Sequence, residues 1–310
     1  MLESTPAPVD SDQPDRSSKS PPGSTVTTKA KILAFVNQKG GTGKTTITQN
    51  LAICLARHHG KRVLCIDLDP QGNLGQGLVA AQIKAAKTAD RLLLVPSASI
   101  SEYIVPIRPA VDLIPNHYQR ELRDAIERLP LSDNLLRKHV SRVTSQYDYI
   151  LIDTPAGLSR TTQFGIDAAD QIVLVVSCGS YALRGASALV AWMGETSARQ
   201  HRSAPAIKVL LNNYDDRRRF DRELRREVAY IFGDGLYQTQ IRTSVKIVEA
   251  AARSVAVVEL AQNSPSATDF RRLGCEVLGL PVVVRTTDES ALRPADSAAQ
   301  KDRTRLKLVS

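Results

Sequence analysis

The chain has 310 residues, of which 42% are hydrophobic and 5% aromatic, and its formal net charge is +9 at pH 7. The hydrophobic share is ordinary for a globular protein and excludes a wholly disordered chain. No apolar run approaches the roughly 18 residues that a membrane span needs, and the first twenty residues contain no apolar signal segment. These features predict a cytoplasmic globular protein.

Two polar segments flank the middle of the chain. Roughly half of residues 1–29 are Pro, Ser, Thr or Gly, which predicts a disordered N-terminal tail, and residues 285–310 predict a flexible C-terminal tail. The tails contribute little charge, so about +8 remains on residues 30–284. A basic folded domain favours an anionic partner, with nucleic acid ahead of a membrane. Charge that serves solubility alone is the alternative.

The four cysteines carry little functional signal. They are scattered without a C-x-x-C pair, at Cys54, Cys65, Cys178 and Cys275. This spacing argues against a metal or redox site and predicts buried, reduced thiols.

Short apolar runs alternate with helical patterns between the tails. Parallel strands covered on both faces are expected at residues 31–37, 62–67, 149–153, 171–177 and 207–211. Helices are expected at residues 45–59, with Ile47, Leu51, Leu55 and His58 on one stripe, and at residues 220–231, with Phe220, Leu224, Val228 and Ile231 on one stripe. This βαβ alternation predicts an α/β fold with a doubly wound, mostly parallel sheet in a single domain spanning residues 30–284.

A glycine-rich segment lies between the first strand and the first helix. It has the spacing of a phosphate-binding P-loop, although Gln38 stands where the usual pattern begins with Gly, and its candidate phosphate contacts are Lys39, Gly40, Gly41, Thr42, Gly43, Lys44, Thr45 and Thr46. Glycines let successive backbone N–H groups surround a phosphate, and the helix N-terminus attracts the same anion. Lys44 would neutralise the β- and γ-phosphates, and the Thr45 hydroxyl would bind Mg²⁺.

A second lysine, Lys39, precedes Lys44 by five positions, and here the sequence resembles the ParA/MinD family of P-loop ATPases. The resemblance implies ATP and Mg²⁺ as cofactors and a homodimer that sandwiches ATP. It also implies that Lys39 contacts the phosphates of the other subunit. The ATP site would then be complete only in the dimer, with Lys39 and Lys44 both catalytic.

Two carboxylate motifs extend the resemblance. The segment 63–73 (VLCIDLDPQGN) is similar to the family's segment after its second strand, which implies that Asp69 is catalytic and aligns or activates the attacking water. The same similarity places Asp67 near the Mg²⁺ shell. Residues 149–155 form an apolar run ending in a carboxylate, as a Walker B strand does, so Asp153 is expected to hold Mg²⁺ through water.

The resemblance is closest to the small ParA partition ATPases. Segments 210–217, 111–116 and 181–185 also resemble family segments, and the first makes Asn212 a candidate contact to the adenine base. A helix-turn-helix domain before the P-loop is not expected, because a 29-residue tail is too short to supply one. Operator-specific repression is therefore not expected. Residues 242–244 (RTS) depart from the Pro-Arg-Asn of many relatives, which affects the adenine loop and the DNA contacts.

A cluster of arginines forms the candidate DNA-binding surface. The resemblance implies nonspecific DNA contacts at Arg217 and Lys246, and the neighbouring candidates are Arg218, Arg219, Arg222 and Arg242. Acidic residues are interleaved, so a solvated, salt-bridged helix face is the alternative. The cluster lacks interleaved aromatic residues, which favours double-stranded DNA over single strands.

The resemblance thus implies a slow, nucleoid-associated partition ATPase that binds DNA as an ATP-bound dimer and releases it on hydrolysis stimulated by a ParB-type partner. One alternative is a relative that positions another cargo, such as a protein compartment, chemoreceptor array or secretion apparatus. A MinD-like membrane ATPase would need an amphipathic C-terminal helix, which the sequence lacks. Iron–sulfur carriers would need paired cysteines, and a small-molecule ligase would not need a basic outer face.

Overall fold

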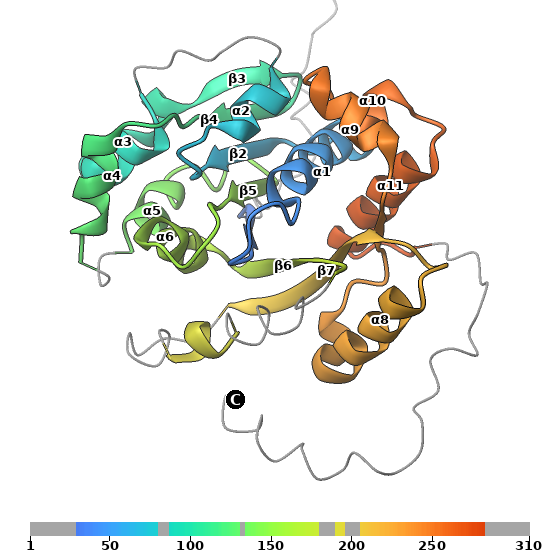
Figure 1. The fold of residues 1–310 in the computed structure, drawn as a ribbon. Coiled ribbons are helices and arrows are strands. Elements are labelled where there is room, and N and C mark those ends of the chain that lie inside the picture. The colour runs from blue at the N-terminus through green and yellow to red at the C-terminus, as the bar shows by residue number, and fades with distance from the viewer. Residues whose placement is uncertain (1–28, 80–86, 131–133, 180–189, 196–204, 283–310) are drawn as a thin grey trace, which may run out of the picture.

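A computed structural model describes residues 29–79, 87–130, 134–179, 190–195 and 205–282 (Figure 1). The strands are β1 (Lys31–Val36), β2 (Val63–Asp67), β3 (Val105–Arg108), β4 (Val111–Ile114), β5 (Tyr149–Asp153), β6 (Gln171–Ser177), β7 (Ala206–Tyr214) and β8 (Ile241–Arg242). The α-helices are α1 (Lys44–His59), α2 (Asn73–Leu78), α3 (Ala89–Leu94), α4 (Arg120–Glu127), α5 (Leu135–Val140), α6 (Arg160–Ala168), α8 (Arg219–Phe232), α9 (Val245–Ala252), α10 (Val257–Leu260) and α11 (Pro265–Val277). The described residues also include the short 3₁₀ helices η1 (Ile100–Tyr103) and η3 (Gly233–Gly235).

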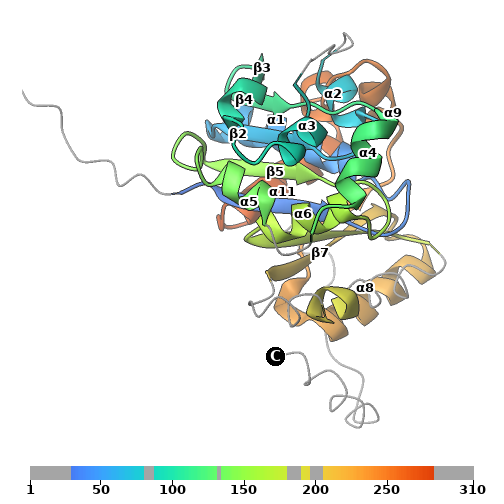
Figure 2. The same cartoon turned by 90° about the vertical axis from the view of Figure 1, so that its left-hand side faces the viewer.

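All the strands belong to one sheet, in the order β3-β4-β2-β5-β1-β6-β7-β8. Neighbouring strands are parallel except for the antiparallel pair of β3 and β4 at one edge. Helices cover both faces of the sheet (Figure 2). The expected α/β fold with a doubly wound, mostly parallel sheet is therefore confirmed.

Alternation along the central strand β1 divides the core into two layers. Ile32, Ala34 and Val36 belong to one buried cluster together with side chains of α3, α5 and α6. Leu33 and Phe35 point to the other face and pack with side chains of α1, α10 and α11. Because both faces are covered, β1 has no polar alternation, which is why it reads as a continuous apolar run.

The apolar runs predicted the central strands closely. β5 and β6 have the predicted bounds, and β1 and β2 are each one residue shorter than their runs. β7 extends beyond the expected 207–211 at both ends, and α1 and α8 each begin one residue earlier than expected. The short strands β3, β4 and β8 were not expected, because two to four residues give little periodic signal.

Both predicted helix stripes are wrong at their ends. In α8, Leu224 and Val228 are buried, but Phe220 is 49% exposed and Ile231 is 38% exposed. In α1, His58 is exposed although the rest of its stripe is buried. In both helices the last residue of the stripe lies outside the core, and in α8 the first residue does too.

The cysteine prediction is correct for two thiols and wrong for two. Cys54 and Cys65 are buried, whereas Cys178 and Cys275 are only partly buried. All four are free thiols. Burial raises the pKa of the Cys54 thiol to about 12, so this group stays protonated at neutral pH.

Several predictions fall on parts of the chain outside the described residues. These include the tail at 1–29, apart from Lys29, the tail at 285–310, and the family-like segment at 181–185. The two tails stay predictions. None of the described helices has the length and apolarity to cross a membrane.

Candidate nucleotide-binding site

The P-loop connects the end of β1 to the start of α1. Gly41 and Gly43 have φ angles of +72° and +92°, a region that L side chains rarely adopt. A Cβ atom at Gly43 would also collide with the side-chain amide of Asn212. Sterics as well as backbone conformation therefore require glycine at this position.

The first turn of α1 is open to an anion. Among the described residues, no side chain caps its N-terminus; no acidic residue lies in its first turn, and the helix is 16 residues long. The amide groups at this end therefore keep their partial positive charge. Together with the glycine turn, they form a cradle that suits a phosphate group.

Two lysines of the loop have different environments. Lys44 is buried, and its Nζ donates to the backbone carbonyl of Asn37 at 3.4 Å. Burial lowers the pKa of Lys44, while Asp153 and Asp69 oppose that shift. Lys39 is exposed, and within the described part of the chain its ammonium pairs with no carboxylate. Lys44 thus points into the site, whereas Lys39 is free to reach a group outside it.

Asp153 lies beside the start of α1, at the carboxyl end of β5. Its Oδ2 accepts a hydrogen bond from the Thr45 hydroxyl at 2.6 Å. Its Oδ1 is buried and has no hydrogen-bond partner among the described residues. Burial raises the pKa of Asp153 to about 7, although Thr45 and Lys44 act in the opposite direction. A buried, unpaired carboxylate oxygen next to a threonine hydroxyl suits a divalent cation.

The neighbouring carboxylate, Asp67, already binds the chain itself. The strand register places Asp67 opposite Asp153. Asp67 Oδ1 accepts from the backbone N–H of Asp69 at 3.0 Å, and its Oδ2 accepts from Leu74 and Gly75 at 3.1 and 3.4 Å. Burial and the nearby Asp153 raise its pKa, while its backbone hydrogen bonds lower it. Asp67 thus braces the loop that follows β2, and its expected place near Mg²⁺ stays a prediction.

Asp69 is partly buried at the start of this loop. Its Oδ1 accepts from the backbone N–H of Gln71 at 2.9 Å, and its Oδ2 accepts no hydrogen bond from the described residues. Asp69 influences the pKa values of both Lys44 and Asp153, which places the three charged groups around one site. One oxygen of Asp69 is therefore available to a molecule in that site.

Asn212 closes the loop from the side of β7. Its Nδ2 donates to the backbone carbonyl of Thr42 at 2.7 Å, and its side chain is buried. The structure therefore gives Asn212 a structural contact to the P-loop, and the expected contact to adenine stays a prediction. Of the remaining expected phosphate contacts, Gly40 lies in the turn before α1 and Thr46 lies in the first turn of α1.

Asn37 is a site residue whose role the sequence did not reveal. Its Nδ2 donates to the carbonyl of Val175 on β6 at 2.6 Å, and its Oδ1 accepts from the backbone N–H of Lys39 at 2.9 Å. Asn37 thereby ties the start of the loop to the neighbouring strand. Its position at the end of a buried strand was the available signal, but its partner lies 138 residues away.

The candidate DNA contacts are exposed, and carboxylates or carbonyls accept hydrogen bonds from most of them. Arg217 forms a bidentate pair with Asp215, and Arg218 lies 3.7 Å from the same carboxylate. The others pair within one or two turns: Arg219 with Glu223, Arg222 with the carbonyl of Asp216, and Lys246 with Glu249. Surface pairs of this kind contribute only about 0–1 kcal/mol to stability. Both the DNA interpretation and the solvated-helix alternative remain compatible with this arrangement.

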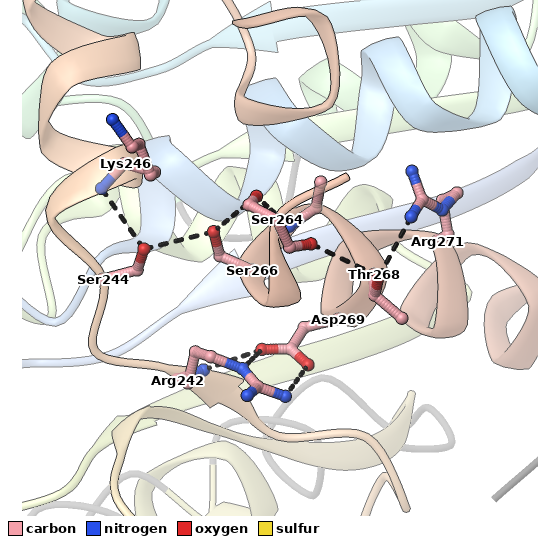
Figure 3. A network of polar contacts seen from close by, with 9 residues as sticks. Arg242, Ser244, Lys246, Ser264, Ser266, Thr268, Asp269 and Arg271 are labelled. Carbon is pink, nitrogen blue, oxygen red and sulfur yellow. Dashed lines mark hydrogen bonds and ion pairs between the residues drawn. The ribbon is translucent and has the colours of Figure 1, made fainter. Parts of the chain in front are cut away.

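Arg242 differs from the other candidates. Its Nε and Nη2 donate to the two oxygens of Asp269 at 2.6 and 2.8 Å, and its backbone N–H also donates to Asp269 at 3.2 Å (Figure 3). The Asp269 side chain is only 3% exposed. This pair joins β8 to α11, so Arg242 has a structural partner that the sequence did not suggest.

The glycine turn, the uncapped helix, Lys44 and the Thr45–Asp153 pair define a P-loop nucleotide-binding protein. A family model described as an AAA domain matches residues 30–205. The chromosome-partitioning ATPase Soj of Thermus thermophilus is 33% identical over 250 residues, which cover 81% of this chain and 96% of that protein. The chain therefore belongs to the ParA/Soj family of partition ATPases.

Solved structures show the same fold. McdA from Cyanothece in complex with ATP has a TM-score of 0.70 and 19% identity, and the match covers 83% of this chain and all of that chain. MinD from Pyrococcus horikoshii in complex with Mg-ADP has a TM-score of 0.64 and 24% identity, covering 80% of this chain and 96% of that chain. Both are similar to this chain in the arrangement of the sheet and helices.

Proposed function

We propose that this chain is a partition ATPase that binds ATP with Mg²⁺, dimerises around the nucleotide and holds nonspecific double-stranded DNA. Hydrolysis, stimulated by a ParB-type partner, releases the DNA. The observation that carries this proposal is the unpaired, buried Oδ1 of Asp153 beside the Thr45 hydroxyl, at the uncapped start of α1. Membership of a family of ATPases supports the same conclusion. The protein would act in the cytoplasm, on the nucleoid.

The site residues divide the chemistry between them. Thr45 and Asp153 would hold Mg²⁺, and the glycine turn with Lys44 would bind the phosphates. The bound cation would neutralise charge on the β- and γ-phosphates. Asp69 would align the attacking water and accept its proton, because its Oδ2 accepts no bond from the described chain.

Asp69→Ala is expected to bind ATP and dimerise but to lower the turnover number by about 10²–10⁴-fold, the usual contribution of a general base. Asp69→Asn keeps an oxygen that can accept the Gln71 N–H and so separates loss of charge from loss of loop structure. Single-turnover hydrolysis with both variants checks this. Turnover of Asp69→Ala within twofold of the wild type would show that another group orients the water.

Lys39 is proposed to act across the dimer. Its side chain is exposed at the mouth of the loop, whereas Lys44 is buried within it. We expect Lys39→Ala to bind ATP with nearly normal affinity but to stay monomeric, because the charge that reaches the second subunit is missing. Light scattering with and without ATP measures this, and Lys39→Arg, which keeps the charge, is the conservative control. A doubling of mass in Lys39→Ala with ATP would contradict the sandwich dimer.

DNA binding is proposed for Arg217, Arg218, Arg219, Arg222 and Lys246. Their present partners are the partly buried carboxylates of Asp215 and Glu249, the exposed carboxylate of Glu223, and the carbonyl of Asp216. Because the five basic side chains are themselves exposed, exchanging these partners for DNA phosphates costs little. Arg242 is proposed mainly as a structural partner of the buried Asp269.

The proposal is tested by measuring ATP hydrolysis together with ATP-dependent pelleting on double-stranded DNA and on anionic liposomes. Pelleting with DNA only is expected, and addition of a ParB-type protein should raise the hydrolysis rate. Pelleting with liposomes only would favour a MinD-like role. Binding of DNA without a response to any ParB-type protein would favour a relative that positions another cargo.

A further inference from the structure

The loop that carries Asp69 is a tight turn held from its inner side. The backbone N–H of Gly72 donates to the carbonyl of Asp69 at 3.0 Å, and Gly72 has a φ angle of +67°. The backbone N–H of Asp69 donates to Asp67 Oδ1 at 3.0 Å. The position of Asp69 therefore depends on the shape of this turn.

The outer side of the same turn packs against Asn116, just beyond β4. A Cβ atom built on Gly72 would lie 2.6 Å from the carbonyl oxygen of Asn116 and 3.8 Å from the Cα atom of His117. The first distance is far below a van der Waals contact. The backbone of Asn116 thus leaves no room for the turn to move outward in its present shape.

The buried carboxylate of Asp90 holds the side chain of Asn116 in place. The Nδ2 of Asn116 donates to Asp90 Oδ1 at 2.9 Å, and the two residues are 5% and 1% exposed. The Oδ1 of Asn116 accepts from the backbone N–H of His117 at 3.0 Å, so both ends of its side-chain amide are engaged. A further backbone bond, from Ala89 to the carbonyl of Pro115 at 2.9 Å, joins the start of α3 to the same segment.

We infer that Asp90 and Asn116 are positioning residues for Asp69. The Asp90–Asn116 hydrogen bond fixes the wall against which the Asp69–Gly72 turn rests, and Asp67 fixes the turn from the other side. This inference rests on the proposed role of Asp69 in hydrolysis. A displacement of about 1 Å at a catalytic group can lower a rate by about 10²-fold, so a wall of this kind affects turnover without touching the nucleotide.

Gly72→Ala tests the contact between the Asp69–Gly72 turn and the backbone of Asn116. Gly60, at the end of α1, is the matched control, because its φ angle is +62° and a Cβ there would meet nothing within 4 Å. Both substitutions carry the strain of a left-handed backbone, but only Gly72→Ala collides with the carbonyl of Asn116. We expect Gly72→Ala to lower turnover at least tenfold with ATP affinity within twofold of the wild type. Gly60→Ala should hydrolyse ATP at the wild-type rate.

Swapping the side chains of Asp90 and Asn116 tests whether their hydrogen bond holds Asn116 in place. Asn116→Asp puts a second carboxylate against Asp90 and removes the donor, so turnover should fall at least tenfold with ATP affinity retained. The double variant Asp90→Asn/Asn116→Asp restores one amide, one carboxylate and the hydrogen bond between them, and it should recover turnover to within about threefold. If the double variant does not recover turnover, or if Asn116→Asp has normal turnover, the inference is overturned.

Amide hydrogen exchange keeps this test independent of the proposed ATPase activity. Exchange of the Gly72 N–H should be faster in Asn116→Asp and return to the wild-type rate in the double variant. The internal reference is the backbone N–H of Val63, at the start of β2, which donates to the carbonyl of Ala110. Unchanged Gly72 exchange in Asn116→Asp would refute the positioning role even in a protein that hydrolyses no ATP. Absence of hydrolysis in the wild type would instead refute the proposed function.

Discussion

Lys44→Ala is expected to weaken ATP binding by about 10²–10³-fold, the largest effect on ATP affinity among the single substitutions proposed for the site. The Lys44 side chain is buried and lies near Asp153 and Asp69. Lys44 is also the first residue of α1, so the free backbone amides of that helix end lie beside it. Removing one partner of a buried charged contact typically costs about 2–5 kcal/mol. Fluorescence titration with a nucleotide analogue or isothermal calorimetry measures the change.

Lys31→Ala is the matched control for this variant. Lys31 begins the same strand, β1, that leads into the P-loop. It lies at the end of the strand farthest from the loop and is exposed. Its substitution should leave ATP affinity within twofold of the wild type. Thermal unfolding of both variants checks that the fold is retained. Normal ATP affinity in Lys44→Ala would contradict the location of the phosphate site.

The double variant Arg217→Glu/Lys246→Glu is expected to lose DNA binding while keeping ATP-dependent dimerisation. Each phosphate contact contributes about 0.9 to the salt dependence of the affinity, so losing about four contacts in a dimer should reduce the slope by about 3.6. At 0.1 M salt this corresponds to a loss of affinity on the order of 10³-fold for all sequences alike. DNA binding at several salt concentrations, paired with light scattering, measures both properties.

A control of equal charge separates a local surface from an overall charge effect. Arg62 and Arg120 are also exposed and also pair with carboxylates, those of Asp148 and Asp124. Arg62→Glu/Arg120→Glu changes the net charge by the same amount. It should reduce DNA affinity only slightly. Equal losses in the two double variants would assign the effect to net charge, and an unaffected Arg217→Glu/Lys246→Glu would favour the solvated-helix interpretation.

The sheet and the phosphate loop could be predicted from local sequence. Buried parallel strands such as β5 and β6 have an uninterrupted run of apolar residues between their ends, so their pattern shows without knowledge of their neighbours. The P-loop combines a turn that needs glycine with a helix start, both of which depend on a few consecutive residues. The exposure of Phe220 and Ile231 could not be predicted in the same way, because it depends on which other parts of the chain pack against the two ends of α8.

Contacts between distant parts of the chain were decided only by the tertiary structure. The sequence makes Asp67 a candidate near the metal, and only the fold shows that the backbone amides of Leu74 and Gly75 donate to its carboxylate. The sequence makes Arg242 a candidate DNA contact, and only the fold shows that Asp269 of α11 pairs with its guanidinium.

The sequence by itself determined which residues form the buried strands and the phosphate loop, because those features depend on side chains within a few positions of one another. The tertiary structure decided which polar side chains remain free to act. A carboxylate or guanidinium is satisfied by whichever partner the fold brings within about 3 Å, and sequence spacing does not specify that partner. Asp153 therefore keeps an unpaired oxygen in the site, whereas Asp67 accepts three backbone hydrogen bonds and Arg242 pairs with Asp269.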